Sequence, residues 1–300
     1  MALVYELFLL SHCSHFRPPM FSFGNMPLIE PSRVCILGAT GRTGRGVLQI
    51  FLSERYRNLE LHIYVRSQAK LLALFPGIES YAGVKVFEGS ITNVKLLTQC
   101  LSGMDTIITT LGENENIPGV RVLNDAATTT VSALETLSQE ATYDWNRPRL
   151  ILLSSATWNT NFAAARPRPV HWAIRNAFCY SYEDLLRAQA IYAAQPQLLQ
   201  LCLVQPPALI EEEPTGHILS TEKVSLAVSY ADLAAGIVEI VTSEAYRDTS
   251  AIGVSSASED QLHHLPEMGR RIVRGILARY APWYFALEWK LWGLLFGHST

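Results

Sequence analysis

The stretch Val34-Cys-Ile-Leu-Gly38-Ala-Thr-Gly41-Arg-Thr-Gly44 decides the fold of this chain. It sets three glycines at the spacing G-x-x-G-x-x-G directly after a short apolar run. The residues that follow, 44–52, carry apolar side chains at helical spacing. A strand, a glycine turn and a helix in this order predict the first part of a parallel β-α-β unit.

Each glycine of this turn has a predicted role in binding an anion. Gly38 permits a tight turn out of the strand, Gly41 lets the backbone approach a diphosphate, and Gly44 lets the helix pack closely on the sheet. The start of the helix offers N–H groups and a partial positive charge to phosphates. We therefore expect the turn to bind a dinucleotide through Gly38, Thr40, Gly41, Arg42, Thr43 and Gly44.

The end of the second predicted strand, 61–65, indicates which dinucleotide is bound. A site that prefers NAD places Asp or Glu there to bind the ribose 2′-hydroxyl, but this chain has Arg66. A guanidinium suits a 2′-phosphate because it offers paired donors, and Arg42 could add a second positive group. The alternative is that Arg66 is an ordinary solvated charge. The missing acid favours NADP (NADPH) over NAD.

The rest of the chain alternates apolar runs with amphipathic segments. This alternation predicts an α/β Rossmann fold, a doubly wound parallel sheet with helices on both faces. We expect one such domain over 31–262, an irregular extension over 1–30 and a helical appendage over 263–300. The predicted strands are 34–37, 61–65, 84–87, 105–110, 150–153, 199–204 and 251–254, and the predicted helices are 44–52, 68–75, 93–101, 119–137, 182–194 and 230–242.

Composition narrows the class of protein further. The chain has 300 residues, of which 49% are hydrophobic and 17% charged, which is enough apolar material for a large core. A net charge of −3 disfavours nucleic acid as a partner. Five scattered cysteines without a C-x-x-C pair argue against a disulfide framework and indicate a reducing, cytoplasmic location. We expect no metal site, because the adjacent His263 and His264 should point apart.

Six short motifs, taken in order, resemble the atypical short-chain dehydrogenase/reductase group with NAD(P)H-binding, NmrA-like domains. Within that group the resemblance is closest to the biliverdin/flavin reductase branch, and it covers about residues 33–256. It implies NADP(H) binding and either a reductase or a cofactor-sensing role. The motifs are G-A-T-G-R-T-G at 38–44, V-R-S at 65–67, T-L-G at 110–112, L-L-S-S-A at 152–156, V-Q-P-P-A-L at 204–209 and S-Y-A-D-L-A at 229–234.

These motifs add cofactor contacts at the carboxyl edge of the sheet, where ligands bind in open α/β folds. Ser90 stands where the group often has an aspartate near the adenine. Leu111 and Gly112 follow the fourth predicted strand, Ser154 ends the fifth, and Pro206 follows the sixth.

One departure from the larger family concerns catalysis. Its Tyr-x-x-x-Lys pair is absent from the helix after the fifth strand, since Tyr180 is followed at that spacing by Asp184 and Tyr182 by Leu186. Hydride transfer does not strictly need this pair, because the nicotinamide carries the chemistry. The sequence thus favours an NADPH-dependent reductase of a flat or apolar small molecule, such as a flavin, bilin or quinone-like acceptor. The alternative is a non-catalytic NADP(H) sensor that binds a partner protein.

Three residues are the predicted catalytic candidates: Ser154, His171 and Tyr180. Ser154 or Ser155 should bind the nicotinamide or the acceptor, with Ser154 favoured. His171 is the best proton donor by its ordinary pKa, although a surface role is an equal alternative. Tyr180 and Tyr182 are weaker candidates, because a tyrosine needs a lowered pKa and no lysine is close in sequence. His171 lies in a segment, 156–181, that we interpret as a long loop forming a lid or substrate wall.

The C-terminal stretch 267–296 combines arginines with many aromatic residues at helical spacing, and Pro282 should divide it into two helices. Aromatic stripes usually pack in a core, which favours docking on the chain's own domain or self-association. The alternative is an amphipathic helix in peripheral contact with a membrane.

Overall fold

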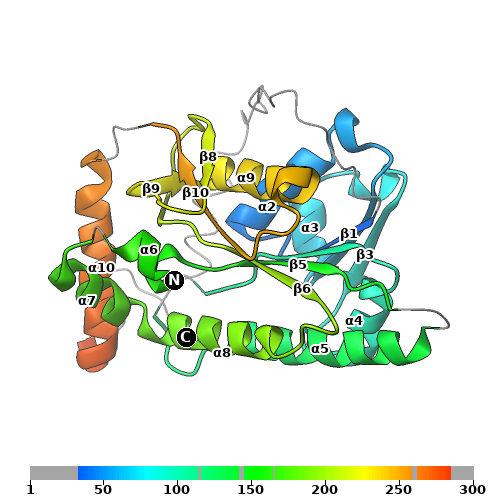
Figure 1. Ribbon diagram of the computed structural model, residues 1–300, viewed down its shortest axis with the longest axis horizontal. Coiled ribbons are helices and arrows are strands. Elements are labelled where there is room, and N and C mark those ends of the chain that lie inside the picture. Colours follow the sequence, from blue (N-terminus) through cyan, green and yellow to red (C-terminus); the bar gives the residue numbers. More distant parts are fainter. Residues whose placement is uncertain (1–32, 114–115, 142–144, 165, 259–261, 285–300) are drawn as a thin grey trace, which may run out of the picture.

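The computed structural model describes residues 33–113, 116–141, 145–164, 166–258 and 262–284. These residues form an eight-stranded sheet with the order β3-β2-β1-β4-β5-β6-β10-β8 (Figure 1). All neighbours run parallel except β8, which pairs antiparallel with β10. The strands are β1 (Arg33–Leu37), β2 (Glu60–Val65), β3 (Val84–Glu88), β4 (Thr106–Thr109), β5 (Arg149–Leu153), β6 (Gln200–Val204), β8 (His217–Ser220) and β10 (Ala251–Ser256).

Helices cover both faces of the sheet, as Figure 1 shows. Successive side chains of a strand point to opposite faces, so Ile36 packs in the core under one helical layer and Leu37 in the core under the other. The strands are therefore apolar on both sides, as the sequence predicted. One layer consists of α2 (Arg42–Phe51), α3 (Gln68–Leu74) and α9 (Tyr230–Thr242), and the other of α4 (Val94–Leu101), α5 (Val122–Glu140) and α8 (Cys179–Ala193).

The order of the strands places a ligand crevice at β1 and β4. The chain winds from β1 outward to β3 and then returns to β4 on the other side of β1. Open α/β sheets bind ligands at the carboxyl ends of the strands at such a switch point. The glycine turn after β1 lies at this edge of the sheet.

The segment 156–181 is mostly helical, so its interpretation as a long loop was wrong. It contains η4 (Ala156–Trp158), α6 (Thr160–Ala163) and α7 (Arg168–Ala177), and α8 starts at Cys179. Pro167 and Pro169 make this segment look irregular in the sequence. Pro169 nevertheless lies in the first turn of α7, where the missing N–H removes no helical hydrogen bond.

A C-terminal helix, α10 (Leu265–Tyr280), packs against α7 at one end of the molecule (Figure 1). The two helices approach so closely that a Cβ at Gly275 would overlap the carbonyl oxygen of Ala177. Tyr280 Oη also donates a hydrogen bond to Asn176 Oδ1 at 2.9 Å. The described residues thus form a single Rossmann-type domain with a docked C-terminal helix.

Parts of the expected N- and C-terminal organisation lie outside the described residues, namely the extension over 1–30 and most of the second helix after Pro282. Within the described part of the chain, no helix combines the length and apolar character needed to span a bilayer.

Candidate active site

The glycine turn has the geometry that its sequence predicts. Gly38 adopts a φ of +96°, a left-handed conformation that glycine reaches without strain. The N–H of Gly41 donates to the carbonyl oxygen of Gly38 at 3.0 Å and closes the turn. A Cβ at Gly44 would overlap that same carbonyl oxygen, so α2 can approach the sheet only with glycine there.

The N-terminus of α2 fits the diphosphate of a dinucleotide. Gly41 is the N-cap and has no side chain to satisfy the N–H groups of the first turn. Among the described residues, a Cβ at Gly41 would meet only the oxygen of Gly38, at 3.3 Å, so these residues leave the space in front of the turn open. Arg42 and Arg45 lie in the first turn, where positive charge opposes the helix dipole. A bound anion would offset both effects.

Arg42 is engaged by protein groups from two other elements. Its Nη1 lies 2.8 Å from Oε1 of Glu211, and its guanidinium stacks over the ring of Tyr230, 5.3 Å from the centroid. Glu211 directly follows β7 (Ala208–Ile210), which pairs with β9 (Ala227–Ser229) in a separate two-stranded sheet. A phosphate would have to compete with Glu211 for Arg42, so the role of Arg42 as a second phosphate group stays a prediction.

Arg66 is exposed at the carboxyl end of β2, one strand away from the glycine turn. The next residue, Ser67, caps α3 by accepting a hydrogen bond from the N–H of Lys70 at 3.2 Å. Among the described residues, no hydrogen bond or ion pair engages the Arg66 guanidinium. It is therefore free to bind a 2′-phosphate.

The predicted contacts after β3 and β4 lie on the same edge of the sheet. Tyr64 Oη donates to the carbonyl oxygen of Ser90 at 2.6 Å, which fixes the chain after β3. Thr110 Oγ1 donates to the carbonyl oxygens of Leu37 and Gly38, both at 3.3 Å. These bonds hold the following residues, Leu111 and Gly112, against the glycine turn.

The two serines at the end of β5 have different environments. Ser154 is buried, and its Oγ accepts a hydrogen bond from Gln189 Nε2 at 2.6 Å. Ser155 Oγ accepts from the N–H of Thr157 and lies 3.4 Å from Tyr182 Oη. The geometry therefore favours Ser155 over the predicted Ser154 as the serine that faces a substrate. Pro206, the predicted contact after β6, is buried and accepts a hydrogen bond from the N–H of Ala156 at 3.0 Å.

A cluster of hydroxyl groups surrounds Tyr182 on α8. Its Oη lies 3.2 Å from Thr157 Oγ1, which in turn accepts a hydrogen bond from Arg166 Nη1 at 3.3 Å. Burial lowers the pKa of Arg166, and the neighbouring Tyr182 acts in the opposite direction. Trp158 packs edge-on against the tyrosine ring, with centroids 5.7 Å apart. The hydroxyl cluster of Ser155, Thr157 and Tyr182 is thus fixed beside a guanidinium.

Tyr180, the predicted catalytic tyrosine, is not part of this cluster. Two residues along a helix differ by about 200° in direction, so Tyr180 and Tyr182 point to opposite sides of α8. The backbone N–H of Tyr180 donates to Asn116 Oδ1 at 2.9 Å. At the spacing of the missing lysine, Asp184 accepts hydrogen bonds from the N–H groups of Leu123 and Asn124 at the start of α5, which is a structural role.

A cavity of about 870 Å³ opens beside the hydroxyl cluster, between η4, α6, α7 and α8. The predicted His171 lines it together with Tyr182. Burial, aided by the charges of Arg166 and Arg175, lowers the pKa of His171. The imidazole therefore carries a proton less readily than a free histidine does, which makes His171 a poorer proton donor than the sequence suggested, and its catalytic role stays a prediction.

The described residues that line this cavity are strongly basic and aromatic. Four arginines face one carboxylate, that of Glu183, and the guanidinium of Arg175 lies 4.3 Å from the centroid of the Trp158 ring. Among the described residues, Nε1 of Trp158 and Nδ1 of His171 are buried without a hydrogen-bond partner. Buried polar atoms normally have partners, so a ligand could supply them. The four arginines are Arg166, Arg168, Arg175 and Arg279.

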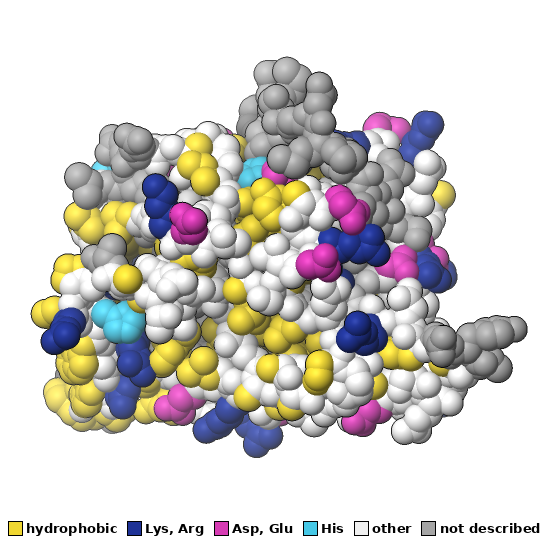
Figure 2. All heavy atoms as spheres, viewed as in Figure 1, with side chains coloured by type: hydrophobic (Ala, Val, Ile, Leu, Met, Phe, Trp, Pro, Cys, Tyr) yellow, Lys and Arg dark blue, Asp and Glu magenta, His cyan; other side chains and the backbone are white. Residues whose placement is uncertain are grey.

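Next to this cavity, the outer surfaces of α7 and α10 carry exposed apolar residues. Figure 2 shows apolar and basic side chains gathered at this end of the molecule. Docking of α10 on α7 agrees with the expectation that the C-terminal segment packs on the chain's own domain. The expected self-association or membrane contact through 267–296 stays a prediction. The exposed residues include Val170 and Trp172 on α7, Val273 and Tyr280 on α10, and Trp283 just beyond the end of α10.

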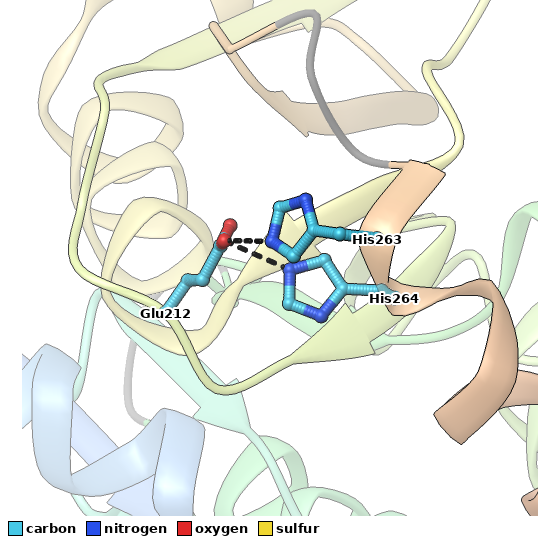
Figure 3. A group of neighbouring side chains, drawn as sticks. All are labelled: Glu212, His263 and His264. Carbon is cyan, nitrogen blue, oxygen red and sulfur yellow. Dashed lines mark hydrogen bonds and ion pairs between the residues drawn. The ribbon is translucent and has the colours of Figure 1, made fainter.

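His263 and His264 do not point apart, so the prediction about their orientation was wrong. Their rings both reach the carboxylate of Glu212 (Figure 3). The adjacency of the two histidines gave no signal of this, because Glu212 lies on a distant loop.

Known proteins agree with a dinucleotide-binding fold. Residues 38–244 match the NAD(P)H-binding family. The chain is 32% identical over 262 residues to the oxidoreductase stcQ of Emericella nidulans, covering 85% of this chain and 94% of that protein. It is 31% identical over 255 residues to the oxidoreductase aflX of Aspergillus parasiticus, covering 84% and 94%.

Solved structures support the same fold. A short-chain dehydrogenase/reductase from Veillonella parvula in complex with NADP superposes with a TM-score of 0.58 at 21% identity, over 76% of this chain and 96% of that one. A Rossmann-fold NAD(P)-binding protein from Shigella flexneri gives a TM-score of 0.52 at 18% identity, over 76% and 94%. Fold and glycine turn together define a Rossmann-type dinucleotide-binding protein. The chain belongs to the NAD(P)H-binding family.

Proposed function

We propose that this protein is an NADPH-dependent reductase that transfers hydride to the carbonyl group of a flat, quinone-like acceptor. The observation that carries the proposal is the hydroxyl cluster of Ser155, Thr157 and Tyr182 at the carboxyl end of β5. The cluster borders a large cavity and lies on the sheet edge that also presents the glycine turn. Both substrates of a reductase could therefore meet there.

The chain's own residues account for polarising the acceptor. Bound NADPH would supply the hydride. Tyr182 Oη would donate a hydrogen bond, and then its proton, to the acceptor oxygen, while Ser155 and Thr157 orient the phenol. Arg166, bonded to Thr157, would stabilise the negative charge that develops on that oxygen. A positive charge is thus available without the lysine of the larger family.

The walls of the cavity indicate the acceptor's shape and charge. Trp158 and Trp172 provide aromatic surface, and the four cavity arginines exceed the single carboxylate. Guanidinium groups recognise carboxylates and ionised phenols through charge-assisted hydrogen bonds. We infer an aromatic acceptor that carries an anionic oxygen group besides the carbonyl. A carbonyl acceptor uses the hydroxyl cluster better than a flavin or bilin, whose reduction does not require a protein acid.

The 2′-phosphate form of the cofactor is part of the proposal. Arg66 supports it, since its guanidinium is exposed at the end of β2 with no acidic residue beside it in sequence. The naming of the relatives as oxidoreductases supports a catalytic role. The runner-up, a non-catalytic NADP(H) sensor, is favoured by one observation: Leu186 stands where a catalytic lysine would follow Tyr182.

The test is anaerobic oxidation of NADPH with matched acceptors. The panel holds 1,4-naphthoquinone, its 2-hydroxy derivative, which is an anion at neutral pH, a derivative with a quaternary ammonium group, and free flavin and biliverdin. We expect turnover of the quinones, with kcat/KM in the order anionic, neutral, cationic. Tight NADPH binding without turnover of any acceptor would contradict the proposal and favour the sensor.

A further inference from the structure

Three metal-ligating side chains converge where α10 begins (Figure 3). His263 Nε2 lies 2.6 Å and His264 Nε2 2.9 Å from Oε1 of Glu212. One ligand atom from each residue lies within 4.8 Å of the others. This cluster is separate from the residues that line the basic cavity.

The two histidines share one side because of the backbone at this point. His264 is the last residue of the 3-10 turn η6 (Leu262–His264) and the N-cap of α10. The backbone therefore changes from a 3-10 turn to an α-helix at His264. The two imidazole rings lie close together, with centroids 4.0 Å apart at an angle of 42°.

Hydrogen bonding alone leaves this cluster unsatisfied. His264 is buried, and among the described residues its Nε2 has no aligned hydrogen-bond partner despite the short distance to Glu212. Two imidazole nitrogens aim at a single carboxylate oxygen. A cation between the three atoms would satisfy all of them, because each would then present a lone pair to it.

We propose that Glu212, His263 and His264 form a Zn²⁺ site. Two imidazoles and one carboxylate are a donor set that zinc binds, with bonds of about 2.0–2.2 Å. In a tetrahedral site such ligand atoms lie about 3.3 Å apart, so the Glu212 carboxylate oxygen, now 2.6 Å from His263 Nε2 and 2.9 Å from His264 Nε2, needs to move away from them by roughly 0.7 and 0.4 Å. His263 is half-exposed, which leaves a path for the ion and a fourth position for water.

The site would join the C-terminal helix to the loop that contacts the glycine turn. Arg271 of α10 already donates to the carbonyl oxygen of Leu209 in β7, at 3.0 Å. Glu211, beside the proposed ligand Glu212, holds Arg42 of α2. Zinc would thus fix residues 211–213 between α10 and the dinucleotide turn. The role is structural, and it does not depend on the proposed reductase activity.

Equilibrium dialysis of the full, untagged chain against Zn²⁺ tests the proposal. Since the chain has eight histidines, variants must locate the ion. We compare wild type with Glu212→Gln, His264→Ala and His263→Gln, and use Glu213→Gln, the neighbouring acid, as the matched control. Far-ultraviolet circular dichroism checks that each variant folds, and the half-exposed His263 gives a variant with little effect on the core.

We expect one tightly bound Zn²⁺ per chain, at least tenfold weaker binding in each ligand variant, and wild-type binding in Glu213→Gln. Substitution with Co²⁺ should give the visible absorption of a four- or five-coordinate site in wild type and lose it in Glu212→Gln. A wild-type chain that retains no zinc would overturn the proposal. So would equal retention by all folded variants, which would place the ion elsewhere.

Discussion

Tyr182 Oη lies 3.2 Å from Oγ1 of Thr157, and the same threonine oxygen accepts a hydrogen bond from Arg166. This relationship connects a phenol on α8 to a guanidinium from the segment between α6 and α7. In the larger family a lysine one helical turn after the tyrosine supplies the positive charge. In this chain the positive charge is that of Arg166, which lies outside α8 and is connected to Tyr182 through the hydroxyl group of Thr157.

Replacing Tyr182 by phenylalanine tests this arrangement. Loss of a general acid should lower kcat by about 10²- to 10⁴-fold with little change in NADPH affinity. Tyr180→Phe is the matched control, since that side chain leaves α8 on the opposite side and should retain wild-type kcat. Steady-state kinetics with the best quinone and calorimetry with NADPH give both quantities. Equal losses in the two variants, or none in Tyr182→Phe, would contradict the assignment.

The His171 imidazole predicts a dependence of stability on pH. Burial, Arg166 and Arg175 lower its pKa from the ordinary 6.5, so the unfolded chain takes up the proton first as pH falls. Titration of His171 therefore does not change the free energy of unfolding well above pH 6.5. Below pH 6.5 it lowers the free energy of unfolding progressively, until the pH has fallen through the lowered pKa of the folded state. Urea unfolding of wild type and His171→Gln at about pH 7.5 and about pH 5.5 measures it. Wild type should lose more stability on acidification; an equal or smaller loss would refute the prediction.

Two glycines of the turn should respond differently to alanine. At Gly44 the added Cβ overlaps the carbonyl oxygen of Gly38, and such overpacking costs about 1–3 kcal/mol of unfolding free energy. At Gly41 the Cβ meets that oxygen only at 3.3 Å, so the fold should persist while the diphosphate is blocked. Urea unfolding and NADPH titration of both variants separate the effects. Wild-type NADPH affinity in Gly41→Ala would show that no phosphate approaches there.

Docking of α10 depends on Gly275. Its Cβ would overlap the carbonyl oxygen of Ala177 on α7, so Gly275→Ala should lower the free energy of unfolding by about 1–3 kcal/mol. Gly269→Ala is the control in the same helix, because no atom of the described part of the chain lies within 4 Å of its added Cβ. Alanine there should stabilise by about 0.5–1 kcal/mol through helix propensity. The reverse order of the two variants in urea unfolding would contradict the packing seen here.

The sequence predicted the sheet and its glycine turn well, because both depend on local patterns. A parallel sheet buried on both faces needs strands that are apolar on both sides, so continuous apolar runs such as Val34 to Leu37 can be recognised in the sequence. The turn at 38–44 can be recognised from its glycines, because the backbone geometry of the turn requires them at this spacing.

The catalytic cluster could not be predicted in the same way. Thr157 and Arg166 lie in a segment of short helices that contains prolines. The segment has no regular pattern of apolar residues from which its position beside Tyr182 could be predicted. The choice between Tyr180 and Tyr182 depends on the rotation of α8, which follows from packing rather than from local sequence. The convergence of Glu212 with His263 is likewise a product of tertiary structure.

Calorimetric titration of wild type and Arg66→Ala with NADPH and NADH measures whether Arg66 binds the 2′-phosphate of the cofactor. We expect wild type to bind NADPH more tightly than NADH. Loss of the charge-assisted contact should weaken NADPH binding by about 1.5–3 kcal/mol, roughly 10- to 150-fold, and leave NADH binding unchanged. Arg57→Ala, beyond the far end of α2, should bind both as wild type does. Equal affinity of wild type for the two dinucleotides, or no binding of either, would contradict the account.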